Sequence, residues 1–366
     1  MRIDRRTLNR ALLDRQLLLR RSALPVLDAV RHLVGLQAQA PNPPYFGLWA
    51  RLDGFRPDVL SELIIDRMAV RVAVMRGTVH LVTAEDCLAL RPLVQPVFDR
   101  PLKSTAPQAV AVRGLALPDV VRATRTLLAE RPRTTTELGV LLQRRWPDRD
   151  PAALVWAMRL QVALIQVPPR GIWGSSGQPT VTTPEAWLGR GLDRRPAPQD
   201  LVLRYLAAFG PASVKDAQTW SGLTRLGEVF ERLRPRLRTY RDQAGAELFD
   251  LPDAVLPDPG TRAPVRYLPE YDNCLRSHAD RDRVVSEPDR QRLASKNDAP
   301  MPTFLVDGFV RGKWRLARSR GAATLTLQPF ARLSKKDTSA VTAEAGRLLD
   351  FAAPGVAGDI RFDDPD

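Results

Sequence analysis

Cysteine and histidine are scarce in this chain, which has two of the first and three of the second among 366 residues. The two cysteines, Cys87 and Cys274, are far apart and show no CxxC spacing, so neither a structural zinc site nor a disulfide framework is expected. GxGxxG, P-loop and HExxH motifs are also missing. These absences predict an activity that needs no metal, nucleotide or redox cofactor, in a reducing cytoplasm.

Long apolar runs are missing as well. No stretch of about 18 apolar residues is present to span a membrane. The basic N-terminal segment MRIDRRTLNRALLDRQLLL is interrupted by Asp14 and Arg15, so it is typical of an amphipathic helix and not of a signal peptide. No membrane partner is expected.

Acidic residues are outnumbered by basic ones, 41 to 55, which leaves a formal net charge of +14. Arginine exceeds lysine roughly eightfold, which is explained by GC-rich codons. That bias does not explain the excess of bases over acids. A charge of this size favours a polyanionic partner such as nucleic acid, because neutralising phosphates releases condensed counterions.

Three successive stretches repeat one pattern of short helices followed by two short strands. Alternating residues at 70–75 and 78–82 predict a first hairpin. Segments 165–167 and 180–182 are expected to form a second, and 237–240 with 247–251 a third. Helices followed by a two-stranded hairpin are the plan of a winged helix, and three in series strengthen this interpretation.

The C-terminal part has a different character. Segments such as TFLVDGFVRGKWRL are rich in β-branched and aromatic residues around an Asp307–Gly308 turn, and a helical pattern follows at 338–351. They predict a small β-barrel or curved sheet with a closing helix. The expected fold class is α+β, with three tandem winged-helix units and a small β-barrel domain, at 1–117, 118–197, 198–255 and 256–366.

Two glutamines, Gln37 and Gln39, are the candidate catalytic residues. A helix is predicted over 23–37, and the prolines that follow end it. Extended residues two apart face the same side, so both amides are expected to face one cleft with Ala38 turned inward. There they could place a water and stabilise a developing charge. The alternative is that they cap the helix end or face solvent.

The segment around these glutamines, GLQAQAPNPPYFGLWARL, resembles the catalytic stretch of the AlkZ-like family of bacterial DNA glycosylases. The hallmark of that family is a Gln-hydrophobic-Gln motif, which Gln37-Ala38-Gln39 matches. Segments 75–86, 268–284 and 304–316 also resemble the family, in the same order. The resemblance implies three tandem winged helices and a β-barrel in a C-shaped molecule.

The resemblance further implies a monofunctional glycosylase for N7-alkylguanine in duplex DNA, with Gln37 and Gln39 as catalytic groups. Some members of the family unhook interstrand crosslinks or bulky N7 adducts, and one protects an antibiotic-producing actinomycete from its own product. A guanine alkylated at N7 is already positively charged and leaves without a proton. Such an enzyme needs mainly to place a water and stabilise the sugar cation, in a cleft open enough for a base tethered to both strands.

Seven residues are candidates for DNA contact. Arg170 and Trp173 lie at the expected tip of the second hairpin, where they could enter a groove or stack on a base. The alternative is that Trp173 packs on its own domain. The other five lie in the family-like C-terminal segments: Arg276, His278, Arg281, Arg311 and Lys313.

For three further residues a structural role is the alternative to a catalytic one. His80 alternates with apolar residues on a predicted strand and is expected to be structural. Glu270 and Asp272 could form a carboxylate pair, but a hydrogen-bond network at the barrel rim is favoured.

The competing interpretation of the whole chain is a winged-helix transcriptional regulator without catalytic activity. Such a regulator is usually a two-fold dimer. Three winged helices in one chain already form a continuous surface, so a monomer associated with the nucleoid is expected.

Overall fold

The first two predicted hairpins are present in the computed structural model of the protein, which describes residues 1–293, 301–319 and 321–365. β2 (Ala69–Ala73) pairs antiparallel with β3 (Val79–Thr83), and β5 (Ile165–Gln166) pairs with β6 (Thr180–Thr182). β2 also pairs with β5, so both hairpins belong to one sheet of order β1-β3-β2-β5-β6-β4. Its edge strands are β1 (Leu36–Gln37) and β4 (Arg133–Thr134). The first two units are therefore continuous through a shared sheet.

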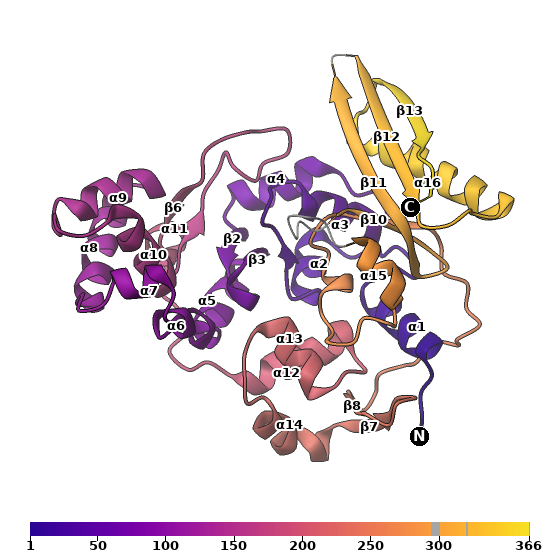
Figure 1. The fold of residues 1–366 in the computed structure, drawn as a ribbon, viewed down its shortest axis with the longest axis horizontal. Coiled ribbons are helices and arrows are strands. Elements are labelled where there is room, and N and C mark those ends of the chain that lie inside the picture. The colour runs from indigo at the N-terminus through magenta and orange to yellow at the C-terminus, as the bar shows by residue number, and fades with distance from the viewer. Residues whose placement is uncertain (294–300, 320, 366) are drawn as a thin grey trace.

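Helices precede each hairpin, as the periodicity predicted. Before the first come α1 (Arg5–Arg15), α2 (Val26–His32), α3 (Pro43–Arg51) and α4 (Pro57–Ile65). Before the second come α8 (Leu117–Glu130), α9 (Thr135–Gln143) and α10 (Pro151–Gln161), which lie at the left of Figure 1. The connecting helices are α5 (Ala84–Leu93), α6 (Gln95–Leu102), α7 (Pro107–Ala111) and α11 (Pro184–Leu188).

The third unit has its own two-stranded sheet, β7 (Arg238–Arg241) with β8 (Glu247–Asp250), after α12 (Pro198–Phe209), α13 (Val214–Ser221) and α14 (Gly227–Leu233). Helix α13 ends at Gly222, whose φ of +81° is left-handed. A Cβ at Gly222 would lie 3.1 Å from the Arg76 Cα, so this helix end packs closely against the turn between β2 and β3. That the units are winged helices in a C-shaped outline stays a prediction.

The C-terminal strands form an open sheet and not the closed barrel expected from the sequence. The order is β13-β12-β11-β10-β9, and within the described residues β9 (Arg266–Leu268) and β13 (Ala357–Phe362) do not pair. The Asp307–Gly308 turn joins β10 (Thr303–Val306) to β11 (Phe309–Ser319), as predicted. β12 (Ala322–Pro329) leads through α16 (Lys335–Ala352) to β13, which pairs with it in parallel. Because apolar residues of α16 are buried in the same core as those of β12, the sheet is covered without closing.

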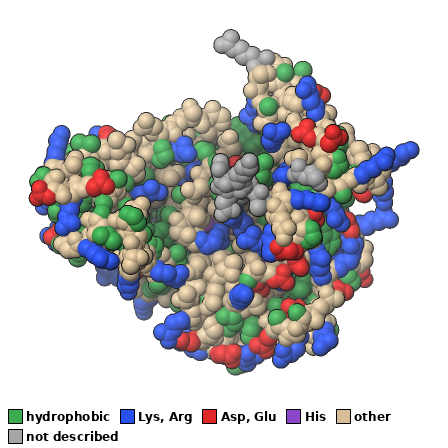
Figure 2. Space-filling view, in the orientation of Figure 1, with side chains coloured by type: hydrophobic (Ala, Val, Ile, Leu, Met, Phe, Trp, Pro, Cys, Tyr) green, Lys and Arg blue, Asp and Glu red, His purple; other side chains and the backbone are tan. Residues whose placement is uncertain are grey.

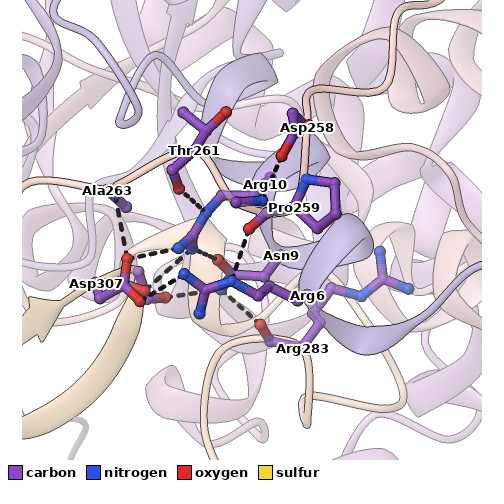
Figure 3. A network of polar contacts seen from close by, with 11 residues as sticks. Arg6, Asn9, Arg10, Asp258, Pro259, Thr261, Ala263, Arg283 and Asp307 are labelled. Atoms are coloured by element: carbon purple, nitrogen blue, oxygen red, sulfur yellow. Dashed lines mark hydrogen bonds and ion pairs between the residues drawn. The ribbon is translucent and has the colours of Figure 1, made fainter.

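A polar network ties α1 to the β10–β11 turn (Figure 3). Arg6 and Arg10 both donate to the Asp307 carboxylate, Arg6 at 2.8 Å and Arg10 at 2.5 Å. The Arg10 side chain is fully buried and also donates to the Thr261 carbonyl. Asn9 donates to the Gly308 and Arg283 carbonyls. The first helix is thus attached to the C-terminal sheet, about 300 residues away along the chain.

No helix of the described residues combines the length and the apolar character needed to cross a membrane.

Candidate active site

The chain leaves its helix before the glutamine motif. Helix α2 ends at His32 and not near Gln37, because Val34 and Gly35 adopt φ values of +54° and +88°. The chain then enters β1, where Leu36 pairs with Leu81 and Gln37 with His80. Ala38 continues the ladder by donating its N–H to the Val79 carbonyl at 2.8 Å, and its side chain is buried. The predicted extended geometry is confirmed for Gln37 and Ala38, whereas Gln39 lies in a bend.

The Gln37 amide is buried and its orientation is set by Arg76. Arg76 Nη2 donates to Gln37 Oε1 at 2.8 Å, while Nη1 donates to the Trp220 carbonyl at 2.5 Å. A guanidinium only donates, so the amide atom that faces it must be the oxygen. The Gln37 NH₂ group is therefore the end available to a bound substrate.

Gln39 lies in a different environment. Its side chain is exposed, and its Oε1 accepts the Val79 N–H at 3.3 Å. It is not among the residues that line the pocket beside Gln37, so the expectation that both amides face one cleft is not met at this pocket. Because the Val79 N–H donates to the oxygen of this amide, the NH₂ group is again its free end.

Two arginines that the sequence interpretation missed, buried Arg71 and half-buried Arg76, hold this segment. Arg71 Nη2 donates to the Ala38 carbonyl at 2.9 Å, and burial followed by the charge of Arg170 lowers the pKa of Arg71 to about 10. Burial, then the nearby charges of Arg276 and Arg281, lowers the pKa of Arg76 to about 10 as well. Arg76 lies in the family-like segment 75–86, and that resemblance could have identified it from the sequence. Arg71 lies on β2, the buried strand that precedes this segment.

A narrow pocket next to Gln37 has the LPEYDN loop as its other wall. Glu270, Tyr271, Asp272 and Asn273 line it together with Gln37. Asp272 accepts two hydrogen bonds from Arg51, at 2.8 and 2.9 Å, and both side chains are 2% exposed. The hydrogen-bond network favoured for this loop is confirmed for Asp272. Glu270 takes no part in it.

Arg276 and Arg281 lie close enough to Arg76 to influence its ionisation, so three guanidinium groups surround the region of Gln37. Arg276 also stands over the Tyr271 ring, 5.8 Å from its centroid. Figure 2 shows Lys and Arg side chains in the hollowed centre of this face, between β3 and α13. This arrangement suits a phosphate backbone next to the glutamines.

Burial contradicts one predicted DNA contact, His278, and packing bears on a second, the partly buried Trp173. His278 is 2% exposed and its Nε2 is 3.0 Å from the Phe209 carbonyl. Burial, together with the charge of Arg283, lowers the pKa of His278 to about 3, so it is neutral and internal. Trp173 packs in an aromatic cluster with Tyr45 and Phe351, at centroid distances of 5.0 and 5.4 Å. The packing alternative therefore accounts for Trp173.

The remaining three candidates lie at or near the surface. Arg170 donates to the Gly177 carbonyl at 3.1 Å in the loop between β5 and β6. Arg311 is exposed on β11, in a separate pocket that Gln37 does not line. Lys313 Nζ donates to the Arg292 carbonyl at 3.1 Å. A role of these residues in DNA binding stays a prediction.

His80, which lies opposite Gln37, is a fully buried neutral histidine. Its Nδ1 donates to the Thr78 carbonyl at 2.9 Å, and burial followed by the charge of Arg76 lowers its pKa to about 3. The structural role expected for it fits this environment. Across the part of the chain that the structure describes, no three His, Cys, Asp or Glu side chains are grouped to hold a metal ion.

Comparisons with known proteins place the chain in a family. The model of the "DNA glycosylase AlkZ-like" family matches residues 30–351. A curated relative, the "Interstrand DNA cross-link repair glycosylase" of Streptomyces sahachiroi, is 22% identical over 92% of this chain and 93% of its own length. The solved structure of "Streptomyces sahachiroi DNA glycosylase AlkZ" has the same fold, with a TM-score of 0.80 and 19% identity over 99% of this chain and 100% of that one. The chain belongs to the AlkZ-like family of DNA glycosylases.

Proposed function

We propose that the protein hydrolyses the N-glycosidic bond of N7-alkylguanine in duplex DNA, including bulky adducts and interstrand crosslinks. Its family consists of DNA glycosylases, and the Streptomyces sahachiroi relative is named as a crosslink repair enzyme. The observation that carries the proposal is the position of Gln37. This residue of the family motif lies on a short edge strand, beside a pocket and within a group of guanidinium side chains.

The chemistry requires little from the enzyme at the leaving base. The C1′–N9 bond breaks, its electron pair neutralises the positive guanine, and a water oxygen adds to C1′ of the sugar. An amide NH₂ group such as that of Gln37 can donate to the water oxygen and hold it in line. Gln39 presents a second NH₂ group at the surface, where it can donate to the substrate. Both glutamines are therefore proposed as catalytic residues.

Replacing each glutamine by alanine tests the assignment. Losing one preorganised donor costs on the order of 10²–10³ in rate in a dry site, so we expect about 10²-fold or less here, because Gln39 is exposed. The double variant should lose less than the product of the two single losses if both amides act on one water. Single-turnover excision of 7-methylguanine from a duplex is the measurement.

Melting temperature and DNA affinity serve as controls on the same samples, and both should change little. Wild-type excision by two folded, DNA-binding alanine variants would overturn the catalytic assignment.

The proposed partner is duplex DNA with an alkylated guanine, bound by a monomer in the nucleoid. A transcriptional regulator is not favoured, since the family whose model matches is one of glycosylases. Formation of abasic sites in 7-methylguanine DNA, compared with binding to undamaged DNA, separates the two functions.

A further inference from the structure

We propose that Glu270 is the catalytic carboxylate, which accepts the proton of the attacking water and balances the charge of the sugar cation. The inference deepens the proposed function and rests on it. It follows from the NH₂ groups that the two glutamines leave free, from the charges around them, and from a carboxylate on the pocket wall that has no partner in another described residue.

Neither glutamine is a base that could take a proton from water, and the oxygen of each already accepts one hydrogen bond. Gln37 Oε1 takes the hydrogen bond of Arg76, and Gln39 Oε1 takes that of Val79. The free end of each amide is an NH₂ group, which can hold the oxygen of a water but cannot take a proton from it. A water held in this way still needs an acceptor on its other side.

The charges around Gln37 also call for a carboxylate. The charges of Arg276 and Arg281 are close enough to Arg76 to lower its pKa. Their field attracts phosphate but raises the energy of a positively charged sugar, because like charges repel strongly where water is excluded. A negative charge on the pocket wall offsets this effect at the reacting carbon.

Two carboxylates of the described residues line the pocket, and of these two Glu270 is the available one. Asp272 is occupied by the two hydrogen bonds from Arg51 and by the Cys274 N–H, at 2.9 Å. Glu270 is half-buried, and among the described residues its carboxylate forms no ion pair and accepts a hydrogen bond only from its own backbone N–H. An unpaired, partly buried carboxylate destabilises a protein, which is typical of a group retained for function.

The loop that carries Glu270 is held in place by its neighbours. The Arg51–Asp272 pair anchors it to α3, and Asn273 Nδ2 donates to the Gly35 carbonyl at 3.2 Å. Tyr271 adopts a φ of +66°, a strained conformation for a residue with a side chain. These contacts hold the Glu270 loop against the turn that leads into Gln37, so Glu270 is fixed beside the pocket that Gln37 also lines.

Burial raises the pKa of Glu270 above its ordinary value of 4.5. The other charged or titratable groups on the pocket are Arg51 from α3 and Tyr271 and Asp272 from the same loop, and Arg51 and Asp272 neutralise each other. A carboxylate with a raised pKa is a better base near neutral pH. In the hydrolysis the water O–H bond breaks, its proton goes to Glu270, and its oxygen bonds to C1′. Glu270 then releases the proton to solvent.

The variant Glu270→Gln tests the proposal in single-turnover excision of 7-methylguanine from duplex DNA. A general base contributes typically 10²–10⁴-fold, so we expect a loss of about 10²-fold. The wild-type rate should fall as pH falls through the pKa of Glu270. The variant should lose this dependence, since the alkylated base is already charged and its departure needs no proton. A wild-type rate or an unchanged acid limb in the variant would overturn the proposal.

Stability separates catalysis from a structural role. Because the ionised carboxyl is disfavoured in the fold, Glu270→Gln should keep or raise the melting temperature at neutral pH. The neighbouring Asp272→Asn should lower it, and the exposed Glu62→Gln is the charge-matched control for the rate.

In Glu270→Ala, added formate should restore part of the rate, whereas chloride at equal ionic strength should not. If the wild-type protein excises no 7-methylguanine, the proposed function fails. If it does and Glu270→Gln is unaffected, only the assignment of Glu270 fails.

Discussion

At the scale of single residues, the site depends on which end of an amide faces the substrate. Spacing alone predicts that Gln37 and Gln39 leave the helix in extended geometry, and the structure has this geometry at Gln37 but a bend at Gln39. It does not predict which atom of each amide is free, because that depends on donors from other segments. Arg76 comes from the turn after β2 and is held by the Trp220 carbonyl of α13. Such long-range partners leave no periodic signal in the sequence.

Arg76→Met should slow excision without preventing folding. Arg76 is a positioning residue, since it acts through the Gln37 amide, and misplacing a reacting group costs up to about 10²-fold. We expect a loss between about 10-fold and 100-fold in single-turnover rate at saturating protein.

The double variant Gln37→Ala/Arg76→Met provides the decisive comparison. If Arg76 works through Gln37, its loss should add nothing once the amide is gone. Independent, multiplicative losses would show that Arg76 acts on the substrate or the fold in its own right.

Buried His80 makes stability depend on pH. Its folded pKa of about 3 is below its ordinary value of 6.5, so the unfolded chain binds a proton that the folded protein does not. The stabilising effect is complete above pH 6.5 and is lost progressively as pH falls toward 3. At pH 5.5 linkage gives a loss of about 1.4 kcal/mol from His80, and buried His278 acts in the same direction.

Urea titrations at pH 7.5 and 5.5 measure this loss. The variant His80→Gln should lose less stability than the wild type on acidification, by about 1.4 kcal/mol. Equal losses in the two proteins would mean that His80 is charged or solvated in the folded state.

At the scale of elements, the sequence predicts local structure better than the partners of each element. Alternation of apolar residues identified all three hairpins and the Asp307–Gly308 turn. The end of α2 was misjudged by five residues, since the left-handed Val34 has a side chain that is rarely found there. The pairing of β2 with β5 and the open C-terminal sheet depend on contacts between distant segments, which hydrophobic periodicity does not encode.

The attachment of α1 to the β10–β11 turn rests on Asp307. Asp307→Ala would leave the fully buried Arg10 side chain without its counter-charge. Breaking a buried pair from one side costs about 3–5 kcal/mol, and we expect the lower end or less because the Asp307 side chain is 44% exposed. The free energy of unfolding in urea is the measurement.

Asp28→Ala is the matched control, because it removes an exposed pair with Arg31 and should cost less than about 1 kcal/mol. Equal effects of the two substitutions would mean that the network in Figure 3 contributes no more than a surface ion pair.

At the scale of the whole molecule, the arginine side chains occupy two kinds of position. Some arginines are internal and hold the site or the fold, such as Arg10, Arg51 and Arg71. Others, such as Arg276 and Arg281, lie around the glutamines, where a phosphate backbone would approach. The net charge predicted a polyanionic partner, and DNA is such a partner for the family of DNA glycosylases to which the chain belongs. It could not distinguish structural from DNA-facing arginines, because both have the same residue type.

Binding to undamaged duplex DNA should therefore weaken steeply with salt. A protein that makes 6–10 phosphate contacts loses about 10³–10⁵ in affinity between 50 and 200 mM salt. Several of the 55 basic residues are buried, so we expect the lower end of that range. Fluorescence anisotropy titrations over this salt range measure the effect. The single-turnover excision rate at saturating protein should change little over the same range, because phosphate contacts act on binding and not on the bond that breaks. A flat affinity would remove the charge argument for DNA, whereas a rate that falls with salt at saturation would place a phosphate contact in the chemical step.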